Sequence, residues 1–371
     1  MTRKARSLVK RLAGPAVFLC ILGATALGCE LLLEYLWPNP YQWERRLIFY
    51  SEGPVFEDKK WGGFLYRPNA TIHTEMYYLT RLFPAAVSKE YEYDIETNSD
   101  GLVQRRDISR TRPAILFLGD SFTEGQGARP WFYAVEDHLS NSRYQLINGG
   151  VLATGVASWA RLYRYLSAKA DVRKLVVIFI SEDWIRPLFQ FPPQMLDCLE
   201  NESRCSGRDL FYPLSGDRAR EPGEAERAAA MRRLFLLEPQ HLIAQSVVLR
   251  KLLIPAYHIL AKAVWGVPTR TDSQFDESER AIRELVAKLG PENVLFAHLP
   301  QKDELDSGPN FLGQMARDFI HRNGYAFFDG FQQCGLTSPD FLAHDMHPNA
   351  LGYAKIGACV EKAVAAHFDL N

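Results

Sequence analysis

Short, uninterrupted apolar runs recur through the C-terminal two-thirds of the chain and leave few folds open to it. Stretches of helical character separate these runs. Strands buried on both faces of a parallel sheet are apolar throughout, whereas half-buried strands alternate between apolar and polar residues. The pattern therefore predicts an α/β domain with a doubly wound parallel sheet. The clear runs are 115–118, 175–180, 294–299 and 325–328, and a weaker one is 144–147.

Two regions do not follow this rhythm. Residues 38–110 are rich in aromatic residues, Pro and Gly, and alternating pieces such as 91–95 predict strands and loops there. Residues 184–274 contain no clear strand, and we expect a helical insertion with an Ala/Arg-rich helix at 225–237. The stretch 241–265 is amphipathic, so it either packs on the core or covers the substrate or a membrane.

The N-terminus has the pattern of a membrane anchor. Five cations and no acid precede an uncharged stretch from Leu12 to Cys29, and apolar residues continue to Trp37. A helix of that length crosses the hydrocarbon core of a bilayer, and the cations are expected to stay on the cytoplasmic side. A cleaved signal peptide, or a lipoprotein signal ending at Cys29, remains an alternative.

The predicted anchor and the change in sequence pattern divide the chain into four parts. We expect a cytoplasmic tail at 1–11, a transmembrane anchor at 12–37, a juxtamembrane segment of strands and loops at 38–110, and the main domain at 111–371. The anchor would place the protein in the inner membrane as a single-pass protein, with its main domain periplasmic or extracellular.

Charge and composition argue against nucleic-acid binding. The 371 residues carry a net charge of -1, and the basic N-terminal cluster leaves the remainder mildly acidic. Such a body offers no basic face to neutralise phosphates. The glycine-rich segment 119–127 lacks the lysine of a phosphate loop, so the sequence predicts no nucleotide cofactor.

The six cysteines allow disulfides without requiring them. Cys198 and Cys205 lie close together in a polar loop, and Cys334 and Cys359 form a second potential pair. Either pair could form a disulfide in an oxidising compartment, or remain as buried thiols. The chain contains no Cys-x-x-Cys motif of a metal or redox site.

A serine follows the first apolar run directly. Gly119 and Asp120 end that run and deliver Ser121 into a turn before a predicted helix, at the sheet edge where α/β folds bind ligands. Because Thr123 stands where an α/β-hydrolase elbow has its second glycine, that fold is disfavoured. Asp120 is expected to hold the turn through backbone hydrogen bonds. A serine hydroxyl needs a base to become a nucleophile.

The base is predicted near the C-terminus, at His347. Asp345, two residues earlier, would orient the imidazole through Nδ1 and leave Nε2 facing the serine. His344, Asp345 and His347 also resemble a metal cluster, but no further His or Cys stands nearby at ligand spacing, so no metal is predicted. His298, in an apolar run, is expected to be a core or edge histidine.

These motifs together resemble the SGNH (GDSL-type) hydrolases, and specifically their membrane-anchored bacterial branch. Residues 119–125 resemble the first block of that family, 345–349 the last block, and 97–102 its lead-in segment. The resemblance implies a flavodoxin-like sheet and ester or acyl-transfer chemistry. It assigns Ser121 as nucleophile, His347 as general base and then acid, and Asp345 as its orienter. The Asp-x-His spacing is also similar to that of the polysaccharide O-acetyltransferase-like relatives.

The resemblance also implies three oxyanion donors: the serine N–H, a glycine N–H in a second block, and an asparagine side chain in a third. The second block resembles 148–155, where Gly150, Ala153 or Gly155 would supply the N–H. The third block has Glu182 in place of the asparagine, and a carboxylate there cannot donate. Either Asn148 or Arg186 replaces that donor, or catalysis is impaired.

Three functions follow from these expectations. The first is a serine esterase that removes an acyl group, such as acetyl, from an envelope glycan or lipid. The second is an O-acyltransferase that uses the same triad on an envelope polysaccharide and is served by a multi-span acyl-donor membrane protein. The third is a non-catalytic envelope protein. For either enzyme, activity should rise with pH as His347 becomes neutral.

Overall fold

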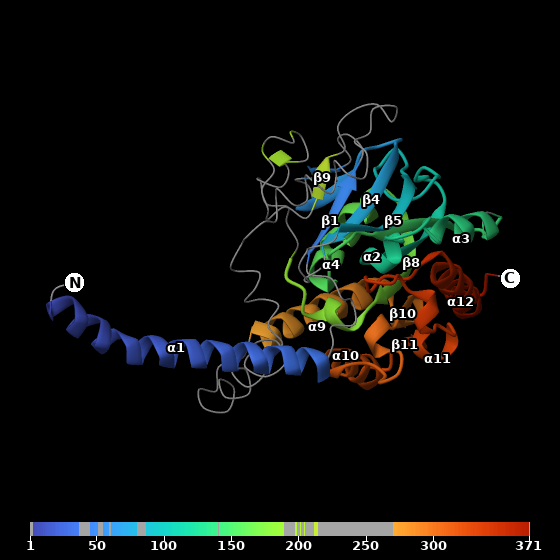
Figure 1. Ribbon diagram of the computed structural model, residues 1–371. Coiled ribbons are helices and arrows are strands. Elements are labelled where there is room, and N and C mark those ends of the chain that lie inside the picture. The colour runs from blue at the N-terminus through green and yellow to red at the C-terminus, as the bar shows by residue number, and fades with distance from the viewer. Residues whose placement is uncertain are drawn as a thin grey trace. The chain divides into compact units, whose positions relative to one another are not determined.

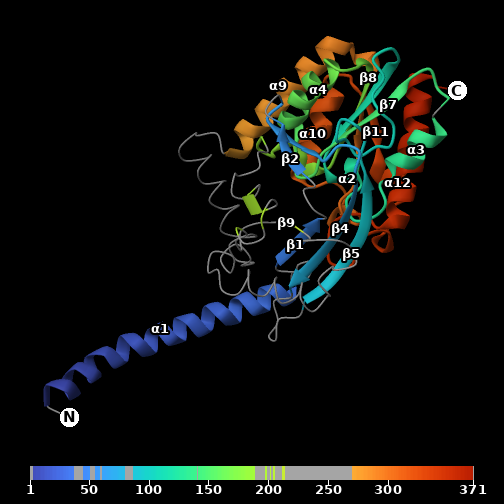
Figure 2. The ribbon, with the colours of Figure 1, turned by 90° about the horizontal axis from the view of Figure 1, so that it is seen from above.

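We describe a computed structural model of the chain (Figures 1 and 2). The chain divides into two compact units, Met1–Gln42 with Leu237–Thr269, and Trp43–Leu236 with Arg270–Asn371. In the first unit the described element is helix α1 (Arg3–Leu36). The structure describes residues 3–36, 45–50, 55–58, 61–79, 87–139, 141–188, 197–198, 201, 204, 211–213 and 270–370.

Helix α1 covers the segment predicted to anchor the protein, but the anchor is not confirmed. Across the residues that the structure describes, no helix is both long enough and apolar enough to cross a membrane. Pro15 lies inside α1, and Glu30 interrupts its apolar stretch. The prediction that residues 12–37 form a transmembrane helix is therefore not supported by the structure.

The second unit is built on a parallel five-stranded sheet in the order β11-β10-β8-β6-β7. Numbered along the chain, this is the flavodoxin-like order 2-1-3-4-5, which places a topological switch point between β6 and β8. Each of the five predicted apolar runs forms one of these strands, so the predicted α/β fold is confirmed. The strands are β6 (Pro113–Gly119), β7 (Gln145–Gly150), β8 (Asp171–Phe179), β10 (Val294–His298) and β11 (Ala326–Asp329).

Helices cover both faces of this sheet (Figure 2). Alternate strand residues, such as Leu116 and Phe117, belong to two different hydrophobic cores, one on each face. One face is covered by α4 (Val156–Ser167), α9 (Arg270–Leu289) and α10 (Phe311–Arg322), and the other by α3 (Phe132–His138) and α12 (Ala350–Phe368). Short helices complete the connections: α2 (Ser121–Glu124), η1 (Ser181–Trp184), η5 (Pro291–Asn293), η6 (Lys302–Glu304), α11 (Gly330–Gln333) and η7 (Ser338–Asp340).

The segment before the main domain forms strands, as its alternating pattern predicts. A four-stranded sheet has the order β5-β4-β1-β9, and β2 pairs with β3 in a separate hairpin. Buried residues of this region share one hydrophobic core with the parallel sheet. The strands are β1 (Arg45–Tyr50), β2 (Val55–Asp58), β3 (Gly63–Tyr66), β4 (Thr71–Leu79), β5 (Val87–Glu96) and β9 (Phe211–Pro213).

Strand β9 corrects the expectation that residues 184–274 contain no strand. It pairs in parallel with β1, with Ile48 opposite Phe211. A three-residue strand is too short to give a periodic signal, so only its pairing with a distant partner identifies it. The helices expected at 225–237 and 241–265 lie outside the described residues.

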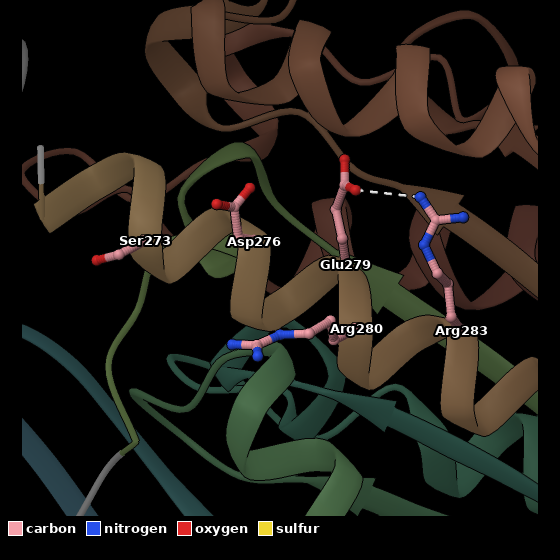
Figure 3. A pocket seen from close by; sticks show the side chains of 5 residues that line it. All are labelled: Ser273, Asp276, Glu279, Arg280 and Arg283. Atoms are coloured by element: carbon pink, nitrogen blue, oxygen red, sulfur yellow. Dashed lines mark hydrogen bonds and ion pairs between the residues drawn. The ribbon is translucent and has the colours of Figure 1, made fainter. Parts of the chain in front are cut away.

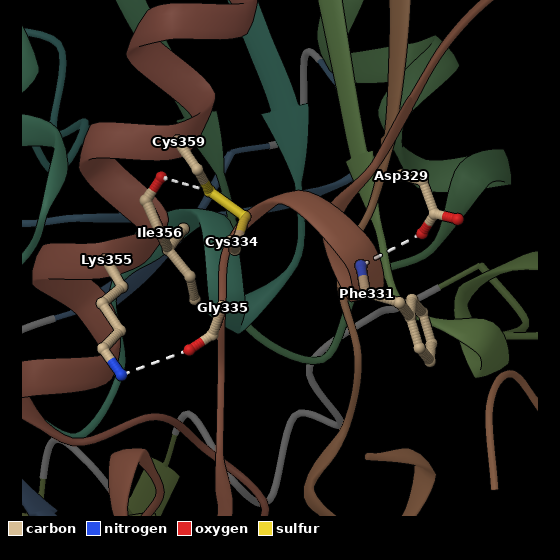
Figure 4. The surroundings of a disulfide bond; sticks show 7 residues. All are labelled: Asp329, Phe331, Cys334, Gly335, Lys355, Ile356 and Cys359. Atoms are coloured by element: carbon tan, nitrogen blue, oxygen red, sulfur yellow. Dashed lines mark hydrogen bonds between the residues drawn. A yellow bond between two sulfur atoms is a disulfide. The ribbon is translucent and has the colours of Figure 1, made fainter. Parts of the chain in front are cut away.

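Of the two predicted cysteine pairs, the structure describes both members of one, and they form a disulfide. Cys334 and Cys359 are bonded and tie the end of α11 to α12 (Figure 4). Beside this bond, the Lys355 ammonium donates to the Gly335 carbonyl at 3.2 Å. Cys198 is also disulfide-bonded, whereas Cys205 lies outside the described residues.

Candidate active site

Ser121 lies at the carboxyl end of β6, at the switch point of the sheet. It is the first residue of α2, and the Asp120 side chain caps this single turn by accepting the Phe122 N–H at 2.9 Å. Gly119 before it has no room for a side chain, because a Cβ would collide with Thr123 and the Ile178 carbonyl. The turn therefore requires glycine at position 119 and is capped by Asp120, and it presents Ser121 at the ligand-binding edge.

The structure brings Ser121, His347 and Asp345 together. His347 Nε2 lies 2.8 Å from Ser121 Oγ, and His347 Nδ1 lies 2.5 Å from Asp345 Oδ1. Asp345 Oδ1 also accepts the His347 backbone N–H at 3.2 Å, which fixes the short loop. Asp345 is fully buried, and only 5% of the surface of Ser121 and 2% of that of His347 are exposed to solvent. A carboxylate at Nδ1 holds the tautomer whose Nε2 can accept the serine proton.

An ion pair supports the turn that carries the serine. Arg186 Nη1 lies 2.9 Å from Asp120 Oδ2 and 2.9 Å from Asp183 Oδ1, and it donates to the Thr154 carbonyl at 3.1 Å. Burial disfavours the charged guanidinium, but the two carboxylates outweigh burial and raise the pKa of Arg186. The arginine therefore stays charged beside Asp120, the residue before Ser121.

Of the three predicted second-block donors, Ala153 fits best. The Gly150 N–H is already used, since it donates to Asn148 Oδ1 at 2.9 Å, so the prediction for Gly150 is wrong. Gly155 caps α4, and a Cβ there would collide with Asp183 and Arg186. Ala153 has a φ of 59°, a left-handed conformation that costs a non-glycine residue about 1 kcal/mol.

Such local strain is common where a backbone group must point at a reacting atom. In the described part of the chain, neither Ala153 nor Ser121 donates its N–H to a backbone carbonyl. The Gly155 N–H donates to no backbone carbonyl there either, so the left-handed conformation of Ala153 is the observation that favours it over Gly155. The N–H groups of Ser121 and Ala153 are therefore the candidates for binding an oxyanion. Positive φ at a residue other than glycine has no sequence signal, so the block alone could not separate Ala153 from its neighbours.

The third-block position is occupied as the sequence predicts, by the acidic Glu182 in η1. Its side chain keeps solvent-exposed surface, yet desolvation by the surrounding protein raises the pKa of Glu182, while Arg186 lowers it. Asp120, Asp303 and Glu304 raise it further. Even when protonated, this carboxyl would offer one donor in place of the two of an amide.

Asn148, the other proposed substitute, is held away from the role of donor by its own contacts. Its Nδ2 donates to the Val103 carbonyl at 2.8 Å, and its Oδ1 accepts the Gly150 N–H. The side chain is fully buried within these contacts. Asn148 therefore shapes the second block without reaching the reaction.

His298 is a core histidine, as predicted, although it lies beside a second buried serine. Its Nε2 is 3.2 Å from Ser181 Oγ, and its Nδ1 accepts from Arg317 Nε at 2.9 Å. Burial, with a contribution from Arg317, lowers the pKa of His298. Because Nδ1 is an acceptor, Nε2 carries the proton and cannot remove one from Ser181.

Two acidic residues near the site were missed by the sequence reasoning. Glu124, fully buried in α2, accepts the Tyr66 hydroxyl at 2.7 Å and the Leu152 N–H at 2.8 Å, next to Ala153. Glu90 on β5 accepts the backbone N–H of His344 at 2.7 Å and pairs with its Nδ1 at 2.8 Å. The N-terminal strands thus contact both loops of the site, and no motif links them to it.

The buried Glu124 predicts a pH-dependent stability. Burial raises its pKa from 4.5 to about 8. The folded state therefore binds this proton more tightly than the unfolded state, and stability falls as pH rises from about 5 to 9. Glu124→Gln resembles the protonated carboxyl, with one acceptor and one donor side.

We expect denaturant unfolding at several pH values to show this difference directly. The free energy of unfolding of the wild type should fall, relative to that of Glu124→Gln, by a few kcal/mol between about pH 5 and 9. Parallel pH curves for the two proteins would refute the assignment.

A surface hollow of about 450 Å³ lies along α9 and not at the triad (Figure 3). Among the described residues, the lining side chains project from successive turns of this helix, and Glu279 pairs with Arg283 at 3.2 Å. These residues are Ser273, Asp276, Glu279, Arg280 and Arg283.

Among the described residues, His73, Glu75 and Glu92 have ligand atoms close enough together for a metal ion. They come from β4 and β5, and His73 Nδ1 already pairs with Asp94 at 2.8 Å.

Comparisons with known proteins give similarities to solved structures only. No family model matches the chain, and no curated protein matches it. A lipase/acylhydrolase from Enterococcus faecalis is 12% identical with a TM-score of 0.35, over 70% of this chain and 97% of that chain. An acetyl xylan esterase from Geobacillus stearothermophilus is 12% identical with a TM-score of 0.35, over 71% and 97%.

A lipolytic protein of the G-D-S-L family from Desulfitobacterium hafniense is 10% identical with a TM-score of 0.32, over 67% of this chain and 98% of that chain.

Proposed function

We propose that this protein is a serine hydrolase of the SGNH type, which cleaves an ester through a covalent acyl-enzyme. The observation that carries the proposal is the continuous hydrogen-bonded relay from Ser121 Oγ through His347 to Asp345. Nucleophile, base and orienter lie within hydrogen-bond reach, in the order that nucleophilic catalysis requires.

Each group has one task in this reaction. His347 Nε2 takes the Ser121 proton while Oγ attacks the ester carbonyl carbon, and Asp345 stabilises the resulting imidazolium. The N–H groups of Ser121 and Ala153 receive the charge that develops on the carbonyl oxygen. His347 then gives its proton to the leaving alcohol. Water, deprotonated by the same imidazole, cleaves the acyl-enzyme and restores the serine.

We propose a small acyl group, such as acetyl, on an envelope glycan or lipid as the substrate. The low exposure of Ser121 favours a small acyl group over a long chain. The Cys334–Cys359 disulfide supports an oxidising, extracytoplasmic location, since such bonds are rare in the cytosol. Free thiols at both positions in freshly isolated protein would contradict that location.

O-acyl transfer uses the same acyl-enzyme and differs only in the acceptor. Exclusion of water from the site decides between the two. We expect the full-length protein to hydrolyse an aryl acetate without any acceptor, and to hydrolyse it at the same rate after acetylatable polysaccharide is added. Phenol release and polysaccharide acetylation are both measured. An acetylated polysaccharide formed as hydrolysis declines would replace the esterase proposal by the transferase.

A further inference from the structure

The oxyanion site of this chain lacks the side-chain amide that the third block would supply, and within the described residues Arg186 is the charged side chain whose donors could replace it. Glu182 stands at the amide position, and the Asn148 amide is held by the Val103 carbonyl and the Gly150 N–H. A site with two backbone donors and an acid nearby would stabilise the transition state poorly.

Arg186 lies where the three segments of the site meet. Its Nη1 contacts Asp120 beside the serine, the Thr154 carbonyl beside Ala153, and Asp183 in η1. Asp120 Oδ2, which receives this bond, is itself 3.4 Å from Ser121 Oγ. The guanidinium is therefore linked to the nucleophile through a single carboxylate oxygen.

The local sequence makes room for this arginine. A Cβ on Gly155 would approach the Arg186 Cβ to 2.7 Å and collide with the Asp183 carbonyl. The absent side chain lets the arginine stem pack against the second block. Asp183 in turn is held by the Ile180 N–H at 2.9 Å, so the partner of the arginine is fixed to the end of β8.

Donors of Arg186 remain available. A guanidinium has five N–H groups, and within the described part of the chain the contacts of Arg186 involve Nη1 alone. The side chain keeps 21% of its surface exposed. A fixed cation with spare donors beside the serine suits a developing negative charge.

We propose that Arg186 is the third oxyanion donor of this enzyme, and that it replaces the amide lost at Glu182 by a charged hydrogen bond to the substrate carbonyl oxygen. This inference rests on the proposed ester hydrolysis. It also explains why an acid can stand at position 182, because the positive charge of Arg186 offsets the negative charge of the Glu182 carboxylate.

The test is a double-mutant cycle between Arg186→Met and Glu182→Asn, with kcat, KM and Tm measured for each protein. We expect Arg186→Met to lower kcat by about 100- to 1000-fold with little change in KM, as expected for loss of an oxyanion donor. Glu182→Asn alone should change kcat less than tenfold, because the third donor is already present. In the Arg186→Met background, the new amide should raise kcat at least tenfold.

Equal effects of Glu182→Asn in both backgrounds would overturn the proposal and leave Arg186 a positioning residue for Asp120. Should Arg186→Met fail to fold, Arg186→Lys keeps a cation beside Asp120 but lacks the planar fork. Its kcat should fall at least tenfold at an unchanged Tm, and a wild-type kcat would refute the inference. Failure of the proposed function itself is distinguishable, since the wild-type protein would then hydrolyse no ester.

Discussion

Replacing Ser121 by alanine is expected to abolish labelling by a fluorophosphonate and to lower ester hydrolysis by about 10⁶-fold. The probe reacts only with a serine whose proton is taken by a base, and Ser121 is 2.8 Å from His347 Nε2. Without Oγ no acyl-enzyme forms, and only the oxyanion donors and substrate binding remain. Labelling is read by intact-protein mass spectrometry and hydrolysis by phenol release.

Ser181→Ala is the matched control for this experiment. Ser181 is also buried and also lies near a histidine, with Oγ 3.2 Å from His298 Nε2. Because Arg317 donates to the other ring nitrogen, His298 cannot act as its base. We expect full labelling of this control. Labelling that persists in Ser121→Ala would show that another serine is the activated one and remove the basis of the proposed function.

The second large effect is expected for Asp345→Asn, which should lower kcat by about 10⁴-fold with the fold intact. Asp345 Oδ1 accepts both the Nδ1 proton and the backbone N–H of His347. An amide of the same size can turn its NH₂ toward the ring, which then holds the wrong tautomer and directs a proton at Ser121. The buried site also loses the negative charge that stabilises the imidazolium. Steady-state kinetics with an aryl acetate measure the effect, and Tm monitors folding.

Glu90→Gln provides a carboxylate control with nearly the same geometry. Glu90 binds the backbone N–H and Nδ1 of His344, three residues before His347, as Asp345 binds those of His347. Glu90 and His344 are not members of the Ser121–His347–Asp345 relay, so loss of their pairing should change kcat less than tenfold. Equal losses in both variants would mean that the loop geometry, and not the Asp345 carboxylate, supports catalysis.

The strands and the two halves of the triad could be predicted from local sequence. A strand buried on both faces must be apolar at consecutive positions, and all five runs, from 115–118 to 325–328, form strands of one parallel sheet. The Gly-Asp-Ser turn requires its own residue types, since Gly119 has no room for a side chain and Asp120 caps α2. Each of these signals involves residues only a few positions apart, so it can be recognised from the sequence alone.

The oxyanion site was only partly predictable. The second block contains three residues of the right type, and choosing between them requires knowing which N–H is already bonded. Asn148 accepts the N–H of Gly150, whereas among the described residues the Ala153 N–H donates to no backbone carbonyl. Hydrogen bonding of that kind depends on the fold around the loop and leaves no pattern in the block.

By itself, the sequence determined the apolar strands, the serine turn and the Asp-x-His loop, because each follows from local burial, backbone geometry or spacing. Only the tertiary structure decided that Ser121 and His347 meet across 226 residues, that Cys334 pairs with Cys359, and that Arg186 joins three segments beside the serine. Such contacts join residues that packing, and not spacing, brings within a few ångströms. The order of the strands carries each motif to the same edge of the sheet, where the chemistry is assembled.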